Sequence, residues 1–240
     1  MQINKNIHKK IMLDILSDMS SDPVLSINLG FKGGTACYFV YNLDRFSVDL
    51  DFDLLNKNKK DIITQRLKTI LEKYGVIQVS KGGFTKLKYS ENLPSLKIDV
   101  SEYFEINKFN TYEIKDVVSG IPLKLLSKKD MFAHKLVALK DRYESKKSNK
   151  QIANRDLYDI NFFFDNNWEF NSKIIKHRTK QDVIDYFREL KNFIENKVDN
   201  KKILDGLGSL VNDKQREFIK NNLKDEVIRK LSIQIEVLRN

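Results

Sequence analysis

The sequence predicts an α+β protein in which helices flank a mixed β-sheet and a helical region follows at the C-terminal end. Two patterns in the 240 residues support this prediction. Apolar and polar residues alternate with a period of two in several short runs before residue 120, which is typical of strands with one buried face. Beyond Ser127 the apolar residues instead recur every three or four positions, which is typical of amphipathic helices.

The first half of the chain switches repeatedly between the helical and the strand pattern. An opening helix is predicted over residues 7–19, and a short apolar helix over residues 36–41. A strand is then predicted over residues 47–54, followed by a longer helix over residues 59–74. Further strands are predicted at residues 76–79, 85–89, 96–104 and 112–118.

Gly82-Gly83 joins two of these alternating runs. Glycine supplies the backbone freedom that tight turns need, so a hairpin is predicted at this point. A hairpin requires antiparallel pairing, and the sheet is therefore predicted to be mixed.

Helices are predicted for most of the chain from residue 127 onward. The short helices of this region are predicted around residues 203–210, 218–223 and 227–238. The change of pattern also places the domain boundary, which gives an α/β domain over residues 1–126 and a mainly helical domain over residues 127–240. A longer helix from residue 181 rests on Val183, Ile184, Phe187, Leu190 and Ile194.

Asp49 and Asp51 are the strongest candidates for a functional site. They alternate with apolar residues in the predicted strand at residues 47–54, so their side chains project from the same face. Two carboxylates this close repel each other unless a cation lies between them. Carboxylate oxygens suit Mg²⁺ or Mn²⁺, and these ions also bind triphosphate oxygens, so the pair predicts a metal site.

A glycine turn, Gly33-Gly34-Thr35, lies shortly before this strand. Glycine lets the backbone approach a phosphate, the start of the following helix presents N–H groups, and the Thr35 hydroxyl is a further donor. By itself, a glycine pair is more often an ordinary turn, and a pair of alternating acids is more often a solvated strand face. Their combination at this spacing favours a phosphate cradle next to a metal.

Asp99 supplies a third carboxylate from another alternating run, where it shares a face with Lys97. On a neighbouring strand it would ligate the ion that activates an attacking hydroxyl, as two-metal phosphoryl or nucleotidyl transfer requires. The alternative is an exposed strand acid without a metal.

Ser127 is predicted to cap a helix that carries Lys135 and Arg142, which lie seven positions apart and therefore on one side. These cations could neutralise triphosphate charge, or they could form a solvated basic stripe. Asp156 and Asp159 share one side of the next predicted helix. They could orient Lys135 or Arg142, or they could cap and solvate the helix.

The order of these motifs resembles the AbiEii/AbiGii toxin family of nucleotidyltransferases. The resemblance covers about residues 25–165 and rests on GGTACYFVYNLDRFSVDLDF, LKIDV, KLVAL with Arg142, and RDLYDI. That family belongs to the DNA polymerase β-like nucleotidyltransferase superfamily, and its members are typically toxins of bacterial toxin–antitoxin or phage-abortive-infection pairs. The resemblance implies a nucleotidyltransferase core that transfers a nucleoside monophosphate from an NTP, and some members modify tRNA ends.

The resemblance also assigns roles to residues of this sequence. It implies that Asp49, Asp51 and Asp99 bind metal and that Lys135 contacts the nucleotide phosphates. It also implies that Asp156 is the acid of the later motif. It places Gly33, Gly34 and Thr35 in the phosphate-binding turn.

Two further residues of the first motif are open to interpretation. Ser47 is predicted either to contact the nucleotide or to brace the acids by hydrogen bonding, and the role of Arg45 is open. Asp53 is a third acid on the same strand face. It is interpreted as a solvated residue at the strand end and not as a further ligand.

The composition points to a soluble cytoplasmic protein with polyanionic partners. The net charge is +10, from 43 Lys and Arg against 33 Asp and Glu, and cationic surfaces gain affinity for RNA through counterion release. Lysine-rich runs such as residues 57–60 and 146–150 could instead be solvated loops, and the biased use of lysine could reflect the base composition of the genome. The single cysteine, Cys37, excludes a disulfide framework and is predicted to be buried. No apolar run is long enough for a membrane span.

Three functions are compatible with these patterns. The leading hypothesis is an NTP-dependent toxin that modifies RNA, such as tRNA, and is controlled by a cognate antitoxin. The second is transfer to a protein or to a small-molecule hydroxyl, such as that of an aminoglycoside. The third is a binding module without turnover, against which the intact set of acids argues.

Overall fold

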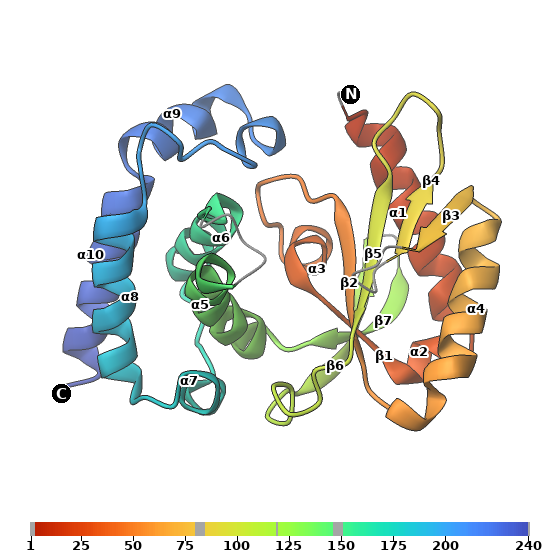
Figure 1. Cartoon of the computed structure of the whole chain (residues 1–240), viewed down its shortest axis with the longest axis horizontal. Helices are drawn as coiled ribbons and strands as arrows, with labels where there is room; N and C mark the ends of the chain where they lie inside the picture. Colours follow the sequence, from red (N-terminus) through yellow and green to blue (C-terminus); the bar gives the residue numbers. More distant parts are fainter. Residues whose placement is uncertain (1–2, 80–84, 119, 146–150, 240) are drawn as a thin grey trace. The chain divides into compact units, whose positions relative to one another are not determined.

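The computed structural model describes residues 3–79, 85–118, 120–145 and 151–239. The chain divides into two compact units, Met1–Ser127 and Lys128–Asn240. The described strands all lie in the first unit, and the described part of the second is helical (Figure 1). Among the helices described, none combines the length and the apolar character that a membrane crossing requires.

The first unit is built on a mixed sheet with the strand order β3-β4-β5-β2-β1-β7-β6. The pairs β2–β5 and β1–β7 are parallel, and the other neighbouring pairs are antiparallel. This arrangement confirms the predicted α+β class and the mixed sheet. The strands are β1 (Leu29–Lys32), β2 (Asp49–Leu54), β3 (Val76–Val79), β4 (Thr85–Lys88), β5 (Leu96–Ser101), β6 (Tyr112–Val117) and β7 (Ile121–Leu126).

Helices cover both sides of this sheet. Three of them pack together on one side, and α3 lies on the other (Figure 1). The first-unit helices are α1 (Lys5–Ser21), α2 (Leu25–Asn28), α3 (Gly33–Val40) and α4 (Lys60–Glu72), with a short 3₁₀ helix, η1 (Lys57–Lys59), before α4.

The side chains of the central strands alternate between the two faces of the sheet. Leu54, Ile98 and Val100 line a groove of about 730 Å³ between the sheet and α4, together with Ile63 and Leu67 of that helix. The acids that alternate with these apolar residues in β2 and β5 therefore project from the opposite face. This alternation explains why the sheet can be apolar on one side and carry a charged site on the other.

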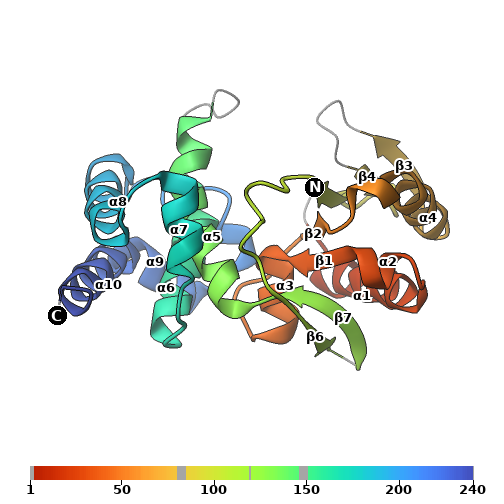
Figure 2. The same cartoon turned by 90° about the horizontal axis from the view of Figure 1, so that it is seen from below.

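The second unit is a helical assembly in which α10 packs on α8 and α6, and α5 packs on α6 and α7. Both views show α8 and α10 running side by side (Figures 1 and 2). Its elements are α5 (Lys128–Glu144), α6 (Asn154–Asp165), α7 (Ser172–Thr179), α8 (Val183–Lys197), η2 (Gly208–Leu210), α9 (Asp213–Asn221) and α10 (Leu223–Val237).

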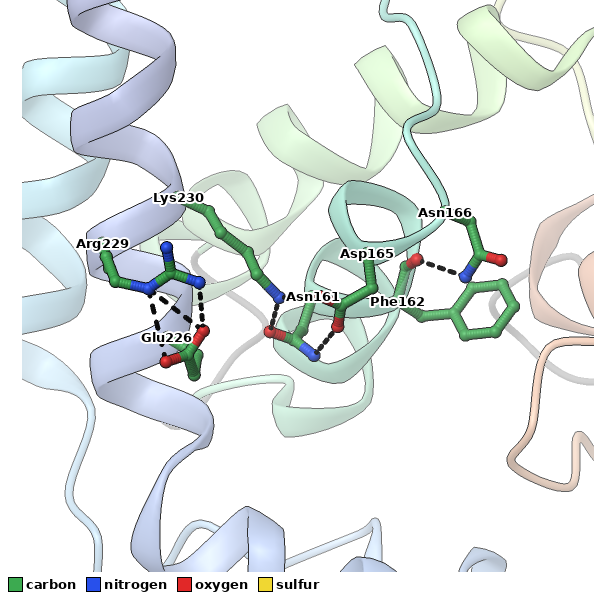
Figure 3. A network of polar contacts seen from close by, with 7 residues as sticks. All are labelled: Asn161, Phe162, Asp165, Asn166, Glu226, Arg229 and Lys230. Atoms are coloured by element: carbon green, nitrogen blue, oxygen red, sulfur yellow. Dashed lines mark hydrogen bonds and ion pairs between the residues drawn. The ribbon is translucent and has the colours of Figure 1, made fainter.

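A buried lysine connects α10 to α6. Lys230 is only 9% exposed, and its Nζ lies 2.7 Å from Oδ1 of Asn161 and 2.5 Å from Oδ1 of Asp165 (Figure 3). Asn161 also donates to Asp165 at 2.8 Å. The neighbouring Arg229 pairs with Glu226 on the exposed side of α10. Burial of an ammonium is tolerated only with such partners, so this contact ties the two helices together.

Most predicted elements of the first unit agree with the structure, but two of its central strands were not predicted. The strands β1 and β7 both lie inside the sheet. The strand predicted over residues 96–104 ends at Ser101, where the chain turns away. The predicted Gly82-Gly83 hairpin turn and the lysine-rich residues 146–150 lie outside the described residues.

The helix predicted over residues 203–210 is also wrong. Residues 200–207 form turns, and only a single 3₁₀ turn, η2, follows. Gly206 has a φ of +68°, which interrupts a right-handed helix. The side-chain amide of Asn154 donates to the carbonyl oxygens of Lys202 and Asp205 at 2.9 and 3.3 Å, which satisfies backbone groups that a helix would have paired.

Candidate functional site

Asp49 and Asp51 lie on β2, and both are half-buried. The residue between them, Leu50, is completely buried on the opposite face. In the parallel pairing of β2 with β5, Asp51 lies directly opposite Asp99, and Asp49 lies opposite Lys97. The predicted neighbourhood of the three acids is therefore a feature of the sheet register.

The charges at this point are incompletely balanced. Burial raises the pKa of Asp51, and the neighbouring Asp49 and Asp99 raise it further against the opposing effect of Lys32 and Lys97. The raised pKa means that burial, together with the neighbouring acids, disfavours the ionised form of Asp51. A divalent cation between the carboxylates would supply positive charge, so the donor set fits Mg²⁺ or Mn²⁺.

Asp99 also contacts a lysine. Its Oδ2 lies 3.4 Å from Nζ of Lys97, its neighbour on the same face. Within the described ranges, no three His, Cys, Asp or Glu side chains converge as a ready-made metal site. Mg²⁺ is commonly held by one or two carboxylates together with substrate phosphates, and the pair Asp49 and Asp51 meets that requirement.

The glycine turn touches the acid pair directly. Gly33 has a φ of +81°, and a Cβ built there would lie 2.6 Å from Oδ2 of Asp51. A Cβ on Gly34 would lie 2.8 Å from the Arg45 guanidinium and 3.0 Å from Oγ of Ser47. Any side chain at these positions would therefore displace the groups around the acids.

The turn also forms the start of α3, and this helix has no side-chain cap. Its N-cap residue, Lys32, makes no capping hydrogen bond. The first N–H groups of a helix have no intrahelical partner, and they favour an anion at that end. Gly33, Gly34 and Thr35 contribute these groups next to Asp51.

The side chains of Thr35 and Ser47 hold this arrangement from within. Thr35 is completely buried, and its hydroxyl lies 2.8 Å from Oγ of Ser47 and donates to the carbonyl oxygen of Asp49. A hydroxyl has one proton to donate, and this one is used inside the protein. Donation by the Thr35 hydroxyl to a phosphate stays a prediction, whereas its backbone N–H belongs to the helix start. Ser47, which is 6% exposed, braces the acid strand, which is one of its two predicted roles.

The interpretation of Asp53 as a solvated strand-end acid is also wrong. Asp53 is 1% exposed, and Nζ of Lys32 donates to its Oδ1 at 2.5 Å. The alternating pattern shows which face of the strand Asp53 lies on, but not whether it is buried there. The sequence therefore did not reveal Lys32 and Asp53 as partners.

His8 supports the start of β2 from α1. It is 1% exposed, its Nε2 lies 2.9 Å from the carbonyl oxygen of Val48, and its Nδ1 lies 2.6 Å from the Tyr89 hydroxyl. Burial lowers the pKa of His8, against the opposing effects of the Val48 carbonyl and Asp49. His8 is therefore a packed, hydrogen-bonded residue.

The second unit contains its own cluster of predicted site residues. Lys135 of α5 is 14% exposed, and its Nζ lies 2.5 Å from Oδ1 of Asp156 and 2.9 Å from Oδ2 of Asp159. Both acids lie on α6 and are buried. Of the two predicted roles, orientation of Lys135 agrees with these contacts, and solvation of the helix does not.

Asp156 is held ionised despite its complete burial. Burial raises its pKa, but Lys135, Arg142 and Arg155 outweigh this effect and bring the pKa to about 2. Nε of Arg142 lies 3.3 Å from Oδ2 of Asp156, and that oxygen accepts no hydrogen bond. The cluster thus combines a well-held lysine with a more exposed arginine whose contact is only electrostatic.

The structure therefore groups the predicted site residues in two clusters. The first unit brings the glycine turn together with the acids, and the second brings Lys135 together with Asp156. The members of the first cluster are Gly33, Gly34, Thr35, Ser47, Asp49, Asp51 and Asp99.

Known structures show that this fold occurs elsewhere. JHP933 from Helicobacter pylori is 22% identical, with a TM-score of 0.54 over 100% of this chain and 98% of that one. A second H. pylori structure is 21% identical, with a TM-score of 0.61 and the same coverage. The nucleotidyltransferase toxin MenT4 from Mycobacterium tuberculosis is 16% identical, with a TM-score of 0.51 over 96% of this chain and 92% of that one.

The sequence itself determines the family. A comparison with curated proteins finds no match. The family described as "Nucleotidyl transferase AbiEii toxin, Type IV TA system" matches residues 14–232, which is most of the chain. The chain belongs to the AbiEii family of nucleotidyltransferase toxins.

Proposed function

We propose that this toxin transfers a nucleoside monophosphate from an NTP to a hydroxyl of RNA, such as a tRNA end, with the help of Mg²⁺ or Mn²⁺. The observation that carries the proposal is the contact between the glycine turn and Asp51, where a Cβ on Gly33 would lie 2.6 Å from the carboxylate. A backbone that can hold phosphates and a carboxylate that can hold a metal are thus immediate neighbours. Nucleotidyl transfer needs both groups at one place.

In this proposal the first unit binds the triphosphate and the metal. The N–H groups at the start of α3 hold phosphate oxygens, and Asp49 and Asp51 provide the metal ligands, with Asp99 as the third acid. When bound, the metal would neutralise the triphosphate charge and lower the pKa of the attacking hydroxyl. The contacts of Thr35 and Ser47 keep the acids in position for this role.

Lys135 is proposed to contact the nucleotide phosphates, and Asp156 to position it. A lysine that acts on phosphate must be held in place while its charge stays available. The two carboxylates within 2.9 Å of Lys135 fix its position. The low pKa of Asp156, about 2, means that it remains an anchor at every physiological pH.

The net charge of the chain and its family indicate the acceptor and the biological setting. A net charge of +10 favours a polyanionic acceptor over a small molecule. A toxin of a toxin–antitoxin system implies an antitoxin partner, and this chain is proposed to act in such a pair, with phage-abortive infection as its setting.

Incubation of the purified chain with each α-labelled NTP, total RNA and Mg²⁺ tests this function. We expect label in RNA, loss of label when EDTA is added, and loss of label in the Asp49→Ala and Asp51→Ala variants. Removal of either acid should reduce transfer by more than about 10³-fold without unfolding the protein, because neither carboxylate is part of the apolar core. Label in protein instead of RNA would show that the acceptor is a protein. Activity within about tenfold of wild type in either variant would overturn the assignment of Asp49 and Asp51 as metal ligands.

A further inference from the structure

Four side chains of the first unit donate hydrogen bonds to the buried carboxylate of Asp53. Besides Lys32, its carboxylate accepts from Asn107 at 2.7 Å, from the Tyr112 hydroxyl at 2.8 Å and from Asn110 at 3.4 Å. A carboxylate that is 1% exposed is costly to bury unless donors of this kind surround it. The four donors thus form a clamp around Asp53, which we call the Asp53 clamp.

The sheet is shaped to admit this clamp. Gly30 of β1 lies directly opposite Asp53 in the antiparallel register with β2. A Cβ on Gly30 would lie 2.3 Å from Cε1 of Tyr112, so the tyrosine ring crosses β1 through the space that the missing side chain leaves. Asn107 and Asn110 reach the same carboxylate from the connection between β5 and β6. Residues from distant parts of the chain therefore converge on one charge.

The clamp determines where the ammonium group of Lys32 lies. Lys32 ends β1, immediately before the glycine turn, and lies directly opposite Asp51 in the register. Its Nζ nevertheless contacts Asp53 at 2.5 Å and Oγ of Ser101 at 3.1 Å. An ammonium has three N–H donors, so one remains without a partner among the described residues. The lysine side chain is 22% exposed, so this donor can reach a ligand.

We propose that Lys32 is a further phosphate-binding residue of the nucleotidyl-transfer site and that Asp53 is the residue that positions it. The inference rests on the proposed function, since it places Lys32 beside the turn that holds the triphosphate. By binding the ammonium, Asp53 keeps it from pairing with Asp51, which stays available for the metal. A cation that is already fixed also loses little side-chain entropy when the phosphates bind.

Binding of inorganic tripolyphosphate with Mg²⁺, measured by calorimetry on the full chain, tests this proposal without turnover or an acceptor. We expect Lys32→Met to weaken binding by about tenfold or more, because a point charge on the phosphates is lost. Asp53→Asn keeps the shape of the side chain but loosens Lys32, and should weaken binding by about threefold to tenfold. The control Lys73→Met removes the same charge from the end of α4, where Lys73 pairs with Asp18, and should bind like wild type.

The double variant separates positioning from mere stability. If Asp53 acts through Lys32, the variant with both Lys32→Met and Asp53→Asn should bind no more weakly than Lys32→Met alone. If Asp53 only stabilises the fold, the two losses should add. Tyr112→Phe provides a milder test that retains the ion pair, and about a threefold loss of affinity is expected from the weakened clamp.

The outcomes distinguish this inference from the proposed function. Unchanged binding in Lys32→Met, together with lost binding in Asp49→Ala, would overturn the role of Lys32 and leave the metal site intact. Additive losses in the double variant would overturn the positioning role of Asp53. Absence of binding by the wild-type chain would overturn both the proposed function and the inference that rests on it.

Discussion

Replacement of Gly33 by alanine should separate the geometry of the proposed site from the stability of the fold. The φ of +81° at Gly33 costs an L-residue about 1–2 kcal/mol. The added Cβ would also lie 2.6 Å from the Asp51 carboxylate, and ordinary contact begins at 3.4 Å, so the carboxylate must retreat by about 0.8 Å. A misplacement close to 1 Å can reduce catalysis by about 10²-fold, so a loss of about tenfold to 10²-fold is expected.

Gly120 offers a matched control in the same unit. Its φ is +73°, so Gly120→Ala carries a similar backbone cost, but no described atom lies within 4 Å of the added Cβ. Urea unfolding should show a loss of about 1–2 kcal/mol in both variants. Transfer of label from an α-labelled NTP should decrease only in Gly33→Ala. Equal transfer by the two variants would refute the reasoning that the glycine turn provides space for Asp51.

Three further predictions concern charged groups elsewhere. The pKa of Asp156, about 2, lies below the usual 3.8, so its ionised form stabilises the fold above about pH 4, and this contribution is lost as the pH falls toward 2. Asp156→Asn should therefore lower the free energy of unfolding by about 2 kcal/mol at pH 7 and reduce the loss of stability between pH 4 and pH 2 in denaturant titrations. An unchanged loss of stability over that pH range would exclude this role. Lys230→Met leaves the buried Asn161 and the half-exposed Asp165 without their cation and should destabilise the protein by about 1–3 kcal/mol. The exposed Arg229→Met should change stability by less than about 1 kcal/mol, and equal effects of the two changes would contradict a stabilising role of the Lys230 contact. Burial lowers the pKa of His8 below 6.5, so the unfolded chain binds this proton more readily, and the wild-type protein should lose stability as the pH falls below about 6.5. In His8→Gln the free energy of unfolding, measured with urea, should not show this dependence on pH. The same dependence on pH in the variant and in the wild type would contradict the role of His8.

Period-two alternation was sufficient to predict which acids share a face, but not which strands are neighbours. Asp49 and Asp51 follow from the local pattern of β2 alone. The position of Asp99 depends on β5 pairing in parallel with β2, and no local pattern specifies that pairing. Its prediction relied on the resemblance to a family and on the chemistry that three acids imply.

The two strands that were not predicted each contain a residue that weakens the strand pattern. Gly30 lies in the four-residue β1, and its lack of a side chain serves Tyr112, a residue far along the chain. Pro122 lies in β7, and proline is generally unfavourable in a strand. In both cases the reason for the residue type lies in tertiary contacts that the sequence does not display.

The error at Asp53 has a physical cause that also bears on Thr35. Asp53 was assigned to solvent because it is polar, yet both residues are almost completely buried and use their polar atoms inside the first unit. Burial of a polar residue depends on partners such as Asn107 and Tyr112, which come from other segments. Residue type and spacing alone cannot distinguish such a partner from a ligand.

The edge strand β3 has a consequence for the behaviour of the protein in concentrated solution. It ends the sheet on one side with the uncharged sequence Val-Ile-Gln-Val, and the side chains of Val76 and Val79 are 64% and 77% exposed. Edge strands of this kind can pair with strands of other molecules, and many proteins prevent such pairing with a charge at the edge. A lysine at position 78 would supply that charge without touching either cluster of site residues. We expect the wild-type chain to self-associate at high concentration in light scattering and the Gln78→Lys variant to remain monodisperse.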